Sequence, residues 1–238
     1  AVLMKKDKAA YLALYDREGN SLAEGEIHGQ NGGYPIAIAL SNDAVKLAVS
    51  MININEGSVK STIAFYNYGT VGQNEIDHCV GVNNYDDMVI PEMEFTSNDR
   101  MVAFGDTKAV IFEGAQKPQA IAEIPMDEKT KSIFYNEHYI GIVTGNEDEA
   151  VTNHLAVYDE NGKLVMEKDF GLDYSSIEFL TNNEICIRNA NVCDIYTVHG
   201  VYKFHHEFEE ELFEIIPGKL KLNYTLVLKD TTQRIRLK

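Results

Sequence analysis

Residues 154–170 have the sequence HLAVYDENGKLVMEKDF, which predicts a β-hairpin. Apolar residues alternate with polar ones on both sides of a turn that contains Asn161 and Gly162. The apolar residues are Leu155, Val157, Leu164 and Met166. Two short strands of this kind around an Asn-Gly are a strong hairpin signal, and glycine takes the positive-φ turn position at no steric cost. Weaker copies of this stretch recur along the chain, so the hairpin indicates a repeated architecture.

The copies share an aromatic residue followed by a turn that contains glycine. They lie at residues 11–27, 62–80, 109–126 and 193–208. With the first hairpin included, the aromatic positions are Tyr15, Tyr66, Phe112, Tyr158 and Tyr196, at intervals of 51, 46, 46 and 38 residues. A period of roughly 40–50 residues with several strands per repeat is typical of propeller blades.

Each repeat also contains a first strand, a turn rich in Ser, Asn and Asp, and a second strand. These pairs occupy residues 36–49, 93–104, 133–143 and 177–187. Ser, Asn and Asp hydrogen-bond their own backbone in tight turns. One repeat is therefore predicted to have four antiparallel strands. No long stretch has a helical period, and the acidic residues 207–213 are interpreted as a strand end or loop.

The two ends of the chain are predicted to hold incomplete repeats. Residues 1–4 align with residues 101–104, so the first repeat lacks its first strand. The last repeat has three strands, at residues 212–217, 222–228 and 234–237. We predict one all-β propeller domain over residues 1–238, with four complete and two partial blades. Because open sheet edges invite aggregation and three plus three strands do not make one blade, we expect further blades N-terminal to Ala1.

Composition narrows the classes of partner. The chain has 238 residues, 45% of them hydrophobic, which is ample for one large domain. Its formal net charge of −16 argues against nucleic acid, whose phosphates need Lys and Arg, and is interpreted as a source of solubility. The sequence has no signal peptide and no apolar run of about 18 residues. Membrane attachment is expected only through an anchor outside this chain.

Three cysteines are present, without a Cys-x-x-Cys pair or a Cys/His zinc spacing. Cys186 and Cys193 flank a predicted turn, so they could face each other across a hairpin. One interpretation is two separate half-buried thiols. The alternative is a cross-strand disulfide, which would suit an oxidising compartment.

Four clusters contain residue types that could form a site, and each lacks the spacing that its chemistry needs. Residues 205–211, HHEFEEE, suggest a metal, but the adjacent His205 and His206 are predicted to point to opposite faces of a strand, along an exposed acidic edge. A calcium loop would use Asn146, Glu147, Asp148, Glu149 and Asn153, which lack alternating spacing and are interpreted as a solvated loop. A carboxylate pair would use Asp86 or Asp87 with Glu92, at a separation that nothing in the sequence sets. Gly32-Gly33 precedes no predicted helix, so it is not a phosphate cradle.

Two stretches carry a resemblance to known proteins. Residues 40–49, LSNDAVKLAV, resemble the strand turn of WD40-like and YVTN-type propellers. Residues 59–73, VKSTIAFYNYGTVGQ, resemble an uncharacterised Gram-positive propeller-like family, domain of unknown function 5711. The resemblance implies a propeller exposed outside the cell behind one N-terminal membrane helix, and it brings no known activity. Asn42-Asp43-Ala44 replaces the usual Asp-Gly, and the chain has no Trp, which argues against a cytoplasmic WD40 scaffold.

Two function classes follow from these features. The first is a non-catalytic module at the cell surface that binds a protein or a wall polymer through its loops, with the 13 Tyr as contact residues. The second is a glycan-active hydrolase or lyase that uses the central channel. An enzyme should place carboxylates or His there, whereas the predicted innermost residues are apolar: Ile36, Ile38, Met93, Phe95, Ile133, Ile177 and Phe179. The sequence favours the first class, with no catalytic, cofactor-binding or metal-ligating residues.

Overall fold

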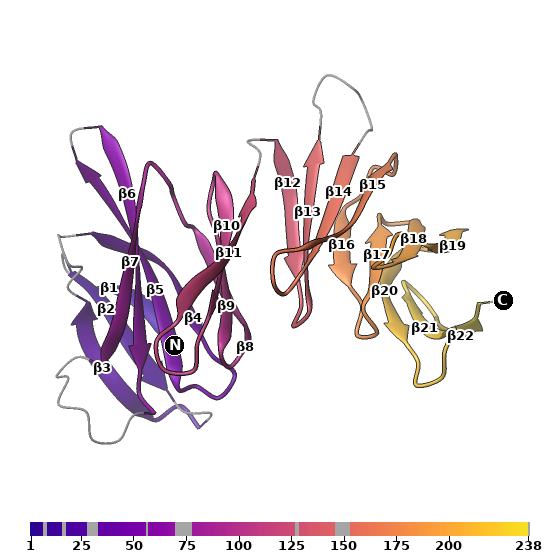
Figure 1. The fold of residues 1–238 in the computed structure, drawn as a ribbon. Coiled ribbons are helices and arrows are strands. Elements are labelled where there is room, and N and C mark those ends of the chain that lie inside the picture. The colour runs from indigo at the N-terminus through magenta and orange to yellow at the C-terminus, as the bar shows by residue number, and fades with distance from the viewer. Residues whose placement is uncertain are drawn as a thin grey trace. The chain divides into compact units, whose positions relative to one another are not determined.

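The computed structural model describes residues 1–6, 9–15, 18–27, 33–55, 57–69, 78–126, 129–145 and 153–237. These residues form 22 β-strands in six antiparallel sheets, and none of them lies in an α-helix (Figure 1). In this part of the chain there is accordingly no helix that could cross a membrane.

Four sheets have four strands each, ordered as in the chain. The first contains β4 (Tyr34–Leu40), β5 (Lys46–Asn55), β6 (Ser58–Asn67) and β7 (Cys79–Asp86). The second contains β8 (Glu92–Ser97), β9 (Arg100–Phe104), β10 (Lys108–Glu113) and β11 (Gln119–Pro125). The third contains β12 (Thr130–Tyr135), β13 (Tyr139–Gly145), β14 (Asn153–Asp159) and β15 (Leu164–Phe170). The fourth contains β16 (Ser176–Phe179), β17 (Glu184–Arg188), β18 (Val192–Thr197) and β19 (Tyr202–Glu207).

Two sheets have three strands, at the two ends of the chain. They contain β1 (Val2–Lys6), β2 (Ala9–Tyr15) and β3 (Ser21–Ile27), and β20 (Leu212–Pro217), β21 (Asn223–Leu228) and β22 (Thr232–Arg236). The predicted four complete and two partial blades are thus confirmed. One boundary was wrong, because β7 begins where the hairpin of residues 62–80 was predicted to end. The connection after β6 is longer than the predicted turn at Gly69, and β7 pairs with β6 as far as Lys60 opposite Asp86.

The hairpin of residues 154–170 forms as predicted. In β14 and β15, Val157 lies opposite Met166. The carboxylate of Asp159 accepts hydrogen bonds from the backbone N–H groups of Asn161 and Lys163, both at 2.9 Å. Gly162 has a φ of 76°, in the left-handed region that favours glycine. Local turn chemistry therefore sets the register of this hairpin.

The chain divides into two compact units, Ala1–Glu128 and Lys129–Lys238. In the N-terminal unit the first strands of neighbouring sheets, β4 and β8, lie side by side, as do β12 and β16 in the C-terminal unit (Figure 1). Each unit has apolar cores of its own, built mainly from the middle strands of its sheets, with first-strand residues such as Met93 and Phe95. Because blades cover both faces of these strands, they carry nearly continuous apolar runs.

The Asn/Asp turns also connect neighbouring blades. The backbone N–H of Asp43 donates to the Asn98 side-chain oxygen at 3.1 Å, and the Lys46 ammonium donates to the Asn98 carbonyl at 2.8 Å. In the C-terminal unit, the side-chain amide of Asn136 donates to the side-chain oxygen of Asn183 at 2.8 Å. The same turn residues therefore close their own turn and bind the equivalent turn of the next blade.

Gly141 in β13 is expected to tolerate no side chain. It lies opposite Phe134 of β12, and a Cβ atom on Gly141 would come within 2.2 Å of the Phe134 ring. That ring packs on Phe179, with centroids 4.6 Å apart, so it has little freedom to move. We expect Gly141→Ala to lower the free energy of unfolding by about 1–3 kcal/mol in urea titrations. In a Phe134→Leu background the added methyl group should cost less than half as much; an equal cost in both backgrounds would contradict the predicted clash.

Candidate functional site: an apolar groove beside β22

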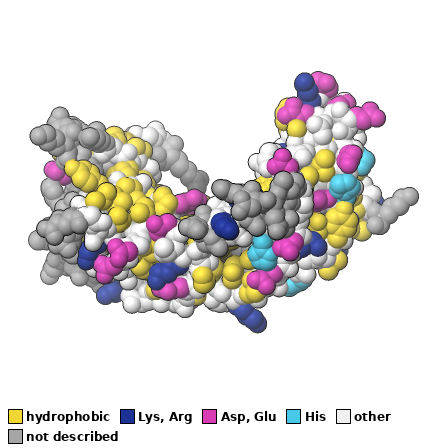
Figure 2. Space-filling view, turned by 90° about the horizontal axis from the view of Figure 1, so that it is seen from above, with side chains coloured by type: hydrophobic (Ala, Val, Ile, Leu, Met, Phe, Trp, Pro, Cys, Tyr) yellow, Lys and Arg dark blue, Asp and Glu magenta, His cyan; other side chains and the backbone are white. Residues whose placement is uncertain are grey.

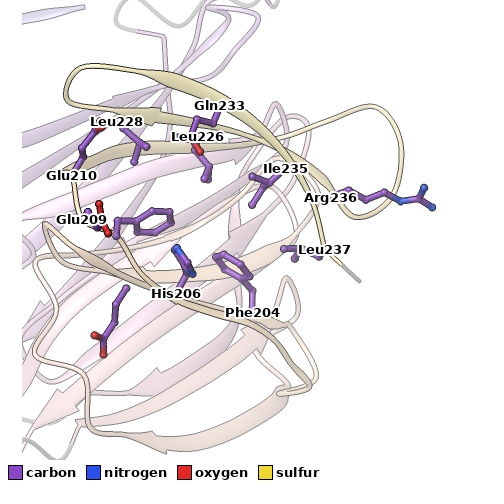
Figure 3. A pocket seen from close by; sticks show the side chains of 12 residues that line it. Phe204, His206, Glu209, Glu210, Leu226, Leu228, Gln233, Ile235, Arg236 and Leu237 are labelled. Atoms are coloured by element: carbon purple, nitrogen blue, oxygen red, sulfur yellow. The ribbon is translucent and has the colours of Figure 1, made fainter.

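A groove of about 510 Å³ lies between β19 and the sheet β20–β22 in the C-terminal unit (Figure 3). Its apolar lining consists of Phe204, Phe208, Leu226, Leu228, Ile235 and Leu237. Its polar lining consists of His206, Glu207, Glu209, Glu210, Gln233 and Arg236. The volume lies within the range of roughly 300–1,000 Å³ that is usual for ligand pockets.

Strand periodicity places these side chains together. Successive strand residues point to opposite faces, so Phe204 and His206 leave β19 on one face. In β22, Gln233 lies opposite Leu226 of β21, which puts both on the groove face. Figure 3 shows Leu226, Leu228 and Ile235 on one side of the groove, facing His206 and Phe204 on the other.

One end of the groove is acidic. Glu209 and Glu210 lie at the end near Leu228, whereas the side chain of Arg236 points away from the groove at its other end (Figure 3). The Glu210 carboxylate accepts a hydrogen bond from the Thr231 hydroxyl at 3.3 Å, which holds it close to the start of β22. A ligand in the groove would therefore meet an apolar floor with carboxylates at one end.

The two adjacent histidines point to opposite faces, as predicted. His206 enters the groove, where its ring stacks on Phe204 with centroids 6.0 Å apart and meets Phe208 edge-on at 4.6 Å. His205 instead lies beside Asp194, with its Nδ1 2.7 Å from the carboxylate. The interpretation of this segment as an exposed acidic edge was incomplete, because Phe204, His206 and Phe208 form one wall of the groove.

A buried polar cluster connects the sheet of β19 to the sheet of β21. Glu184, at the start of β17, forms a salt bridge with Lys203 of β19. The Tyr224 hydroxyl of β21 donates to Glu184 at 2.5 Å, and Lys203 donates to that hydroxyl at 3.3 Å. Burial, and then the hydrogen bond to Glu184, raise the pKa of Tyr224. The cluster joins the two sheets that line the groove through side-chain contacts.

The remaining candidates from the sequence are not brought together as sites. Asp86 forms an exposed ion pair with Lys60 at 2.8 Å, and Asp87 closes a turn with a φ of 52°. Within the described ranges, no group of three or more His, Cys, Asp or Glu side chains could hold a metal ion. Asn153 is buried and accepts a hydrogen bond from Lys131 at 3.1 Å.

Two of the candidates fall partly outside the described residues. Residues 146–149 of the proposed calcium loop are among these, as is Gly32. Gly33 is described and directly precedes β4, a strand rather than a helix.

Sequence reasoning missed carboxylates on the first strands. It considered Glu92 as a partner of Asp86 or Asp87 but not Glu94, which alternates with Met93 and Phe95 along the same strand, β8. Burial, and then the charge of Glu92, raise the pKa of Glu94. On β16, Glu178 lies 3.7 Å from the Arg188 guanidinium. Along these strands apolar residues alternate with acidic ones, so the apolar face is covered and the acidic residues lie on the other face. This alternation is the sequence signal that could have indicated the carboxylates.

Cys186 and Cys193 face each other, as the sequence suggested, but both are fully buried rather than half-buried. Their sulfur atoms are 3.6 Å apart and the thiols are free. Cys186 lies opposite Ile195 and Cys193 opposite Arg188, so the two cysteines are diagonal neighbours. Diagonal Cα atoms are about 7–8 Å apart, beyond the usual disulfide span of about 4.4–6.8 Å.

The cysteine pair is therefore expected to be present as unreactive thiols. Its hydrogen bond, and then burial, raise the pKa of Cys186, and the thiolate is the reactive form. Ellman's reagent should titrate the half-buried Cys79 in the native protein, and all three thiols after denaturation. Denatured protein that shows only one thiol would instead demonstrate a Cys186–Cys193 disulfide.

Acidic side chains are dispersed among hydrophobic and uncharged ones on the face seen in Figure 2. Exposed tyrosines are also present, among them Tyr34, Tyr202 and Tyr15. The dispersed acids fit a role in solubility. The exposed tyrosines fit the expectation that some of them contact a partner.

Sheets of four antiparallel strands, repeated along the chain with their first strands side by side, define the β-propeller class. The chain belongs to a family of unknown function, DUF5711, which matches residues 1–237. No curated protein matches the sequence.

Several solved propellers resemble the chain in structure. The WD40 domain of Neurospora crassa Pan2 has a TM-score of 0.47 and 7% identity, over 98% of this chain and 73% of that one. The β-propeller domain of the Pyrococcus furiosus Trilobed protease, described as having an open velcro topology, has a TM-score of 0.48 and 10% identity, over 85% and 70%. A putative 6-phosphogluconolactonase from Bacteroides fragilis has a TM-score of 0.47 and 15% identity, over 87% and 69%. At these scores, none of their activities or partners transfers to this chain.

Proposed function

We propose that this propeller is a non-catalytic interaction module that binds a protein or a wall polymer at the surface of a Gram-positive cell. A membrane anchor outside this chain would hold it there. The observation that carries the proposal is the groove beside β22, which offers apolar and aromatic contact area next to an acidic end. Such a surface recognises a partner by shape and charge.

The side chains around the groove suit binding better than chemistry. His206 lies against two aromatic rings, those of Phe204 and Phe208, which neither donate nor accept a proton. General acid–base catalysis needs a titratable group within hydrogen-bond reach of the proton it transfers. Phe204, Phe208 and Ile235 supply contact area and no reactive atom.

Capture of a partner by the intact surface protein tests this function. Tagged protein would be purified from cross-linked cells, and bound proteins and wall fragments identified by mass spectrometry. Enrichment of one partner over a tag-only control, together with accessibility of the propeller to protease added outside the cells, is the expected result. Protection from external protease in intact cells would contradict the surface location.

Glu94 favours a second candidate, a glycan hydrolase or lyase. A carboxyl group with a raised pKa beside a second carboxylate, Glu92, is an arrangement that general acid catalysis can use. Release of reducing ends from purified cell wall, abolished by Glu94→Gln, would establish this activity and overturn the non-catalytic proposal. We expect no release above a heat-inactivated control.

A further inference from the structure

At three places in the described part of the chain, the ammonium of a lysine lies over the ring of a tyrosine from a neighbouring blade. The pairs are Lys108–Tyr85 at 5.7 Å from the ring centroid, Lys168–Tyr196 at 5.0 Å and Lys203–Tyr224 at 5.9 Å. Lys108 and Lys203 each form a salt bridge as well, with Glu123 and Glu184. Within the described residues, no ion pair joins Lys168 to a carboxylate. Lys168 is therefore the member of the three whose charge is left for another anion.

The acidic neighbours of Lys168 in β15 face away from it. Successive strand residues point to opposite faces, so Glu167 and Asp169 leave β15 on the face opposite to Lys168. Their carboxylates lie 3.8 and 2.8 Å from the ring nitrogens of His154. The half-buried Lys168 side chain points toward the next blade, where its ammonium meets Tyr196. The alternation of β15 thus keeps its carboxylates from neutralising this ammonium.

Strands β18 and β19 place an exposed ring and an imidazole around Tyr196. Tyr202 is 52% exposed, and its ring packs on that of Tyr196 with centroids 5.2 Å apart. Asp194 lies opposite His205, and its carboxylate is 2.7 Å from the imidazole Nδ1. Burial, and then the charge of Asp194 and a hydrogen bond to it, raise the pKa of Tyr202. We call Lys168, Asp194, Tyr196, Tyr202 and His205 the Lys168 cluster.

The composition of the Lys168 cluster suits a saccharide better than a protein segment. The face of an aromatic ring is partially negative, so it attracts the weakly positive C–H face of a sugar ring. The ammonium, the imidazole and the tyrosine hydroxyl supply donors and acceptors for sugar hydroxyl groups. The centre of a protein interface is instead a desolvated, well-packed pocket, whereas the exposed ring of Tyr202 borders polar and charged groups. The ammonium of Lys168 adds a preference for an acidic substituent, because charge-assisted hydrogen bonds are the stronger ones.

We propose that the Lys168 cluster binds an acidic sugar of a surface polymer, a pyranose that carries a carboxylate or a phosphate. The sugar ring stacks on Tyr202, and its acidic group accepts hydrogen bonds from the Lys168 ammonium. Its hydroxyl groups bind to the imidazole of His205, which Asp194 holds through Nδ1. The net charge of −16 does not prevent this contact, since charges more than about 8 Å away are largely screened at physiological salt. The inference rests on the proposed function as an interaction module and names the class of its ligand.

Three amino sugars that differ in their acidic group test the preference. N-acetylmuramic acid is N-acetylglucosamine with an added lactyl carboxylate, and N-acetylglucosamine 6-phosphate carries a phosphate instead. In saturation-transfer NMR titrations of the intact protein, at least one acidic sugar should bind about tenfold more tightly than N-acetylglucosamine. The tighter of the two identifies carboxylated or phosphorylated polymers as the source. Equal affinities for all three sugars, or no binding of any, would overturn the proposal.

Substitutions in the cluster assign these contacts. Lys168→Gln should lower the affinity for the acidic sugar to that for N-acetylglucosamine, whereas Lys168→Arg keeps a charge that stacks on aromatic rings and should keep the preference. Tyr202→Ala should abolish binding of all three sugars. The matched controls, Lys163→Gln and Tyr34→Ala, change the same residue types at exposed positions outside the cluster and should bind as the unmodified protein does. Unchanged binding by Lys168→Gln and by Tyr202→Ala, with both variants folded by circular dichroism, would show that the sugar lies elsewhere.

Two outcomes separate this inference from the proposed function. If the intact surface protein and its Lys168→Gln/Tyr202→Ala variant capture the same partner equally, the sugar site is wrong and the interaction module stands. If the acidic sugar binds as expected but the propeller is protected from external protease in intact cells, the sugar site stands and the surface location is wrong.

Discussion

Glu184→Ala is expected to lower the free energy of unfolding by about 3–5 kcal/mol, because it leaves the largely buried Lys203 side chain without its carboxylate partner. The two side chains are only 11% and 19% exposed, and Glu184 also accepts the hydrogen bond from Tyr224. Breaking a buried pair in this way is costly, since the remaining charge loses both water and its partner. Urea unfolding followed by circular dichroism measures the change, as the chain has no Trp.

Two further variants separate the effect of the Glu184–Lys203 charges from that of the Tyr224 hydrogen bond. Glu184→Met/Lys203→Met removes both charges and keeps apolar volume, so it should be less destabilising than Glu184→Ala alone. Tyr224→Phe removes one hydrogen bond and should cost about 1–2 kcal/mol. A cost of Glu184→Ala below about 1 kcal/mol would show that water reaches the ammonium and that the pair is not a buried one.

The same cluster predicts a loss of stability at alkaline pH. Burial lowers the pKa of Lys203, but its hydrogen bonds to Glu184 and Tyr224 outweigh burial, so the pKa lies above the ordinary value of 10.5. The pKa of Tyr224 also lies above its ordinary value of 10.0. Both groups hold their protons more tightly in the folded state than in the unfolded state. Their contribution to the free energy of unfolding is therefore complete below the ordinary pKa values, and it is lost as the pH rises through the pKa values of the folded state. The difference in stability between the native chain and Glu184→Met/Lys203→Met should therefore shrink as the pH rises above the ordinary values of 10.0 and 10.5.

Phe112→Ala is expected to cost about 3–5 kcal/mol, through lost apolar burial and the cavity that it leaves in the N-terminal unit. Phe112 is 0% exposed, and its ring packs on Phe65 with centroids 5.1 Å apart. Met101 and Val110 belong to the same core cluster. Urea denaturation midpoints at constant m-value would measure the loss.

The stability cost of Phe112→Ala is compared with that of a conservative substitution and that of a substitution at an exposed position. Phe112→Leu keeps most of the volume and should cost less than half as much as Phe112→Ala. Phe213→Ala removes the same ring from an exposed position and should change stability by no more than about 0.5 kcal/mol. Equal costs at residues 112 and 213 would contradict the core that the structure places around Phe112.

The strands and their grouping followed from the sequence because the information is local. Period-two apolarity decides which residues of a strand are covered, and the aromatic-Gly and Asn/Asp turns decide where strands reverse. Gly162 and the four-strand repeat were predicted on this basis and confirmed. The opposite orientation of His205 and His206 followed from the same local rule. The incomplete ring, the anchor and the cell-surface location stay predictions.

The groove and the buried cluster were decided by tertiary structure. Phe204, Leu226 and Ile235 lie on three different strands, and they meet only because the sheet of β19 packs against the sheet of β21 and β22. Glu184 and Tyr224 are likewise far apart in the chain and in contact in the fold. Alternation shows that one face of a strand is covered but not which strand covers it, because packing between blades depends on side-chain shapes on both sheets at once. The sequence thus determined the blades of this protein, and the packing of one blade on the next determined its candidate site.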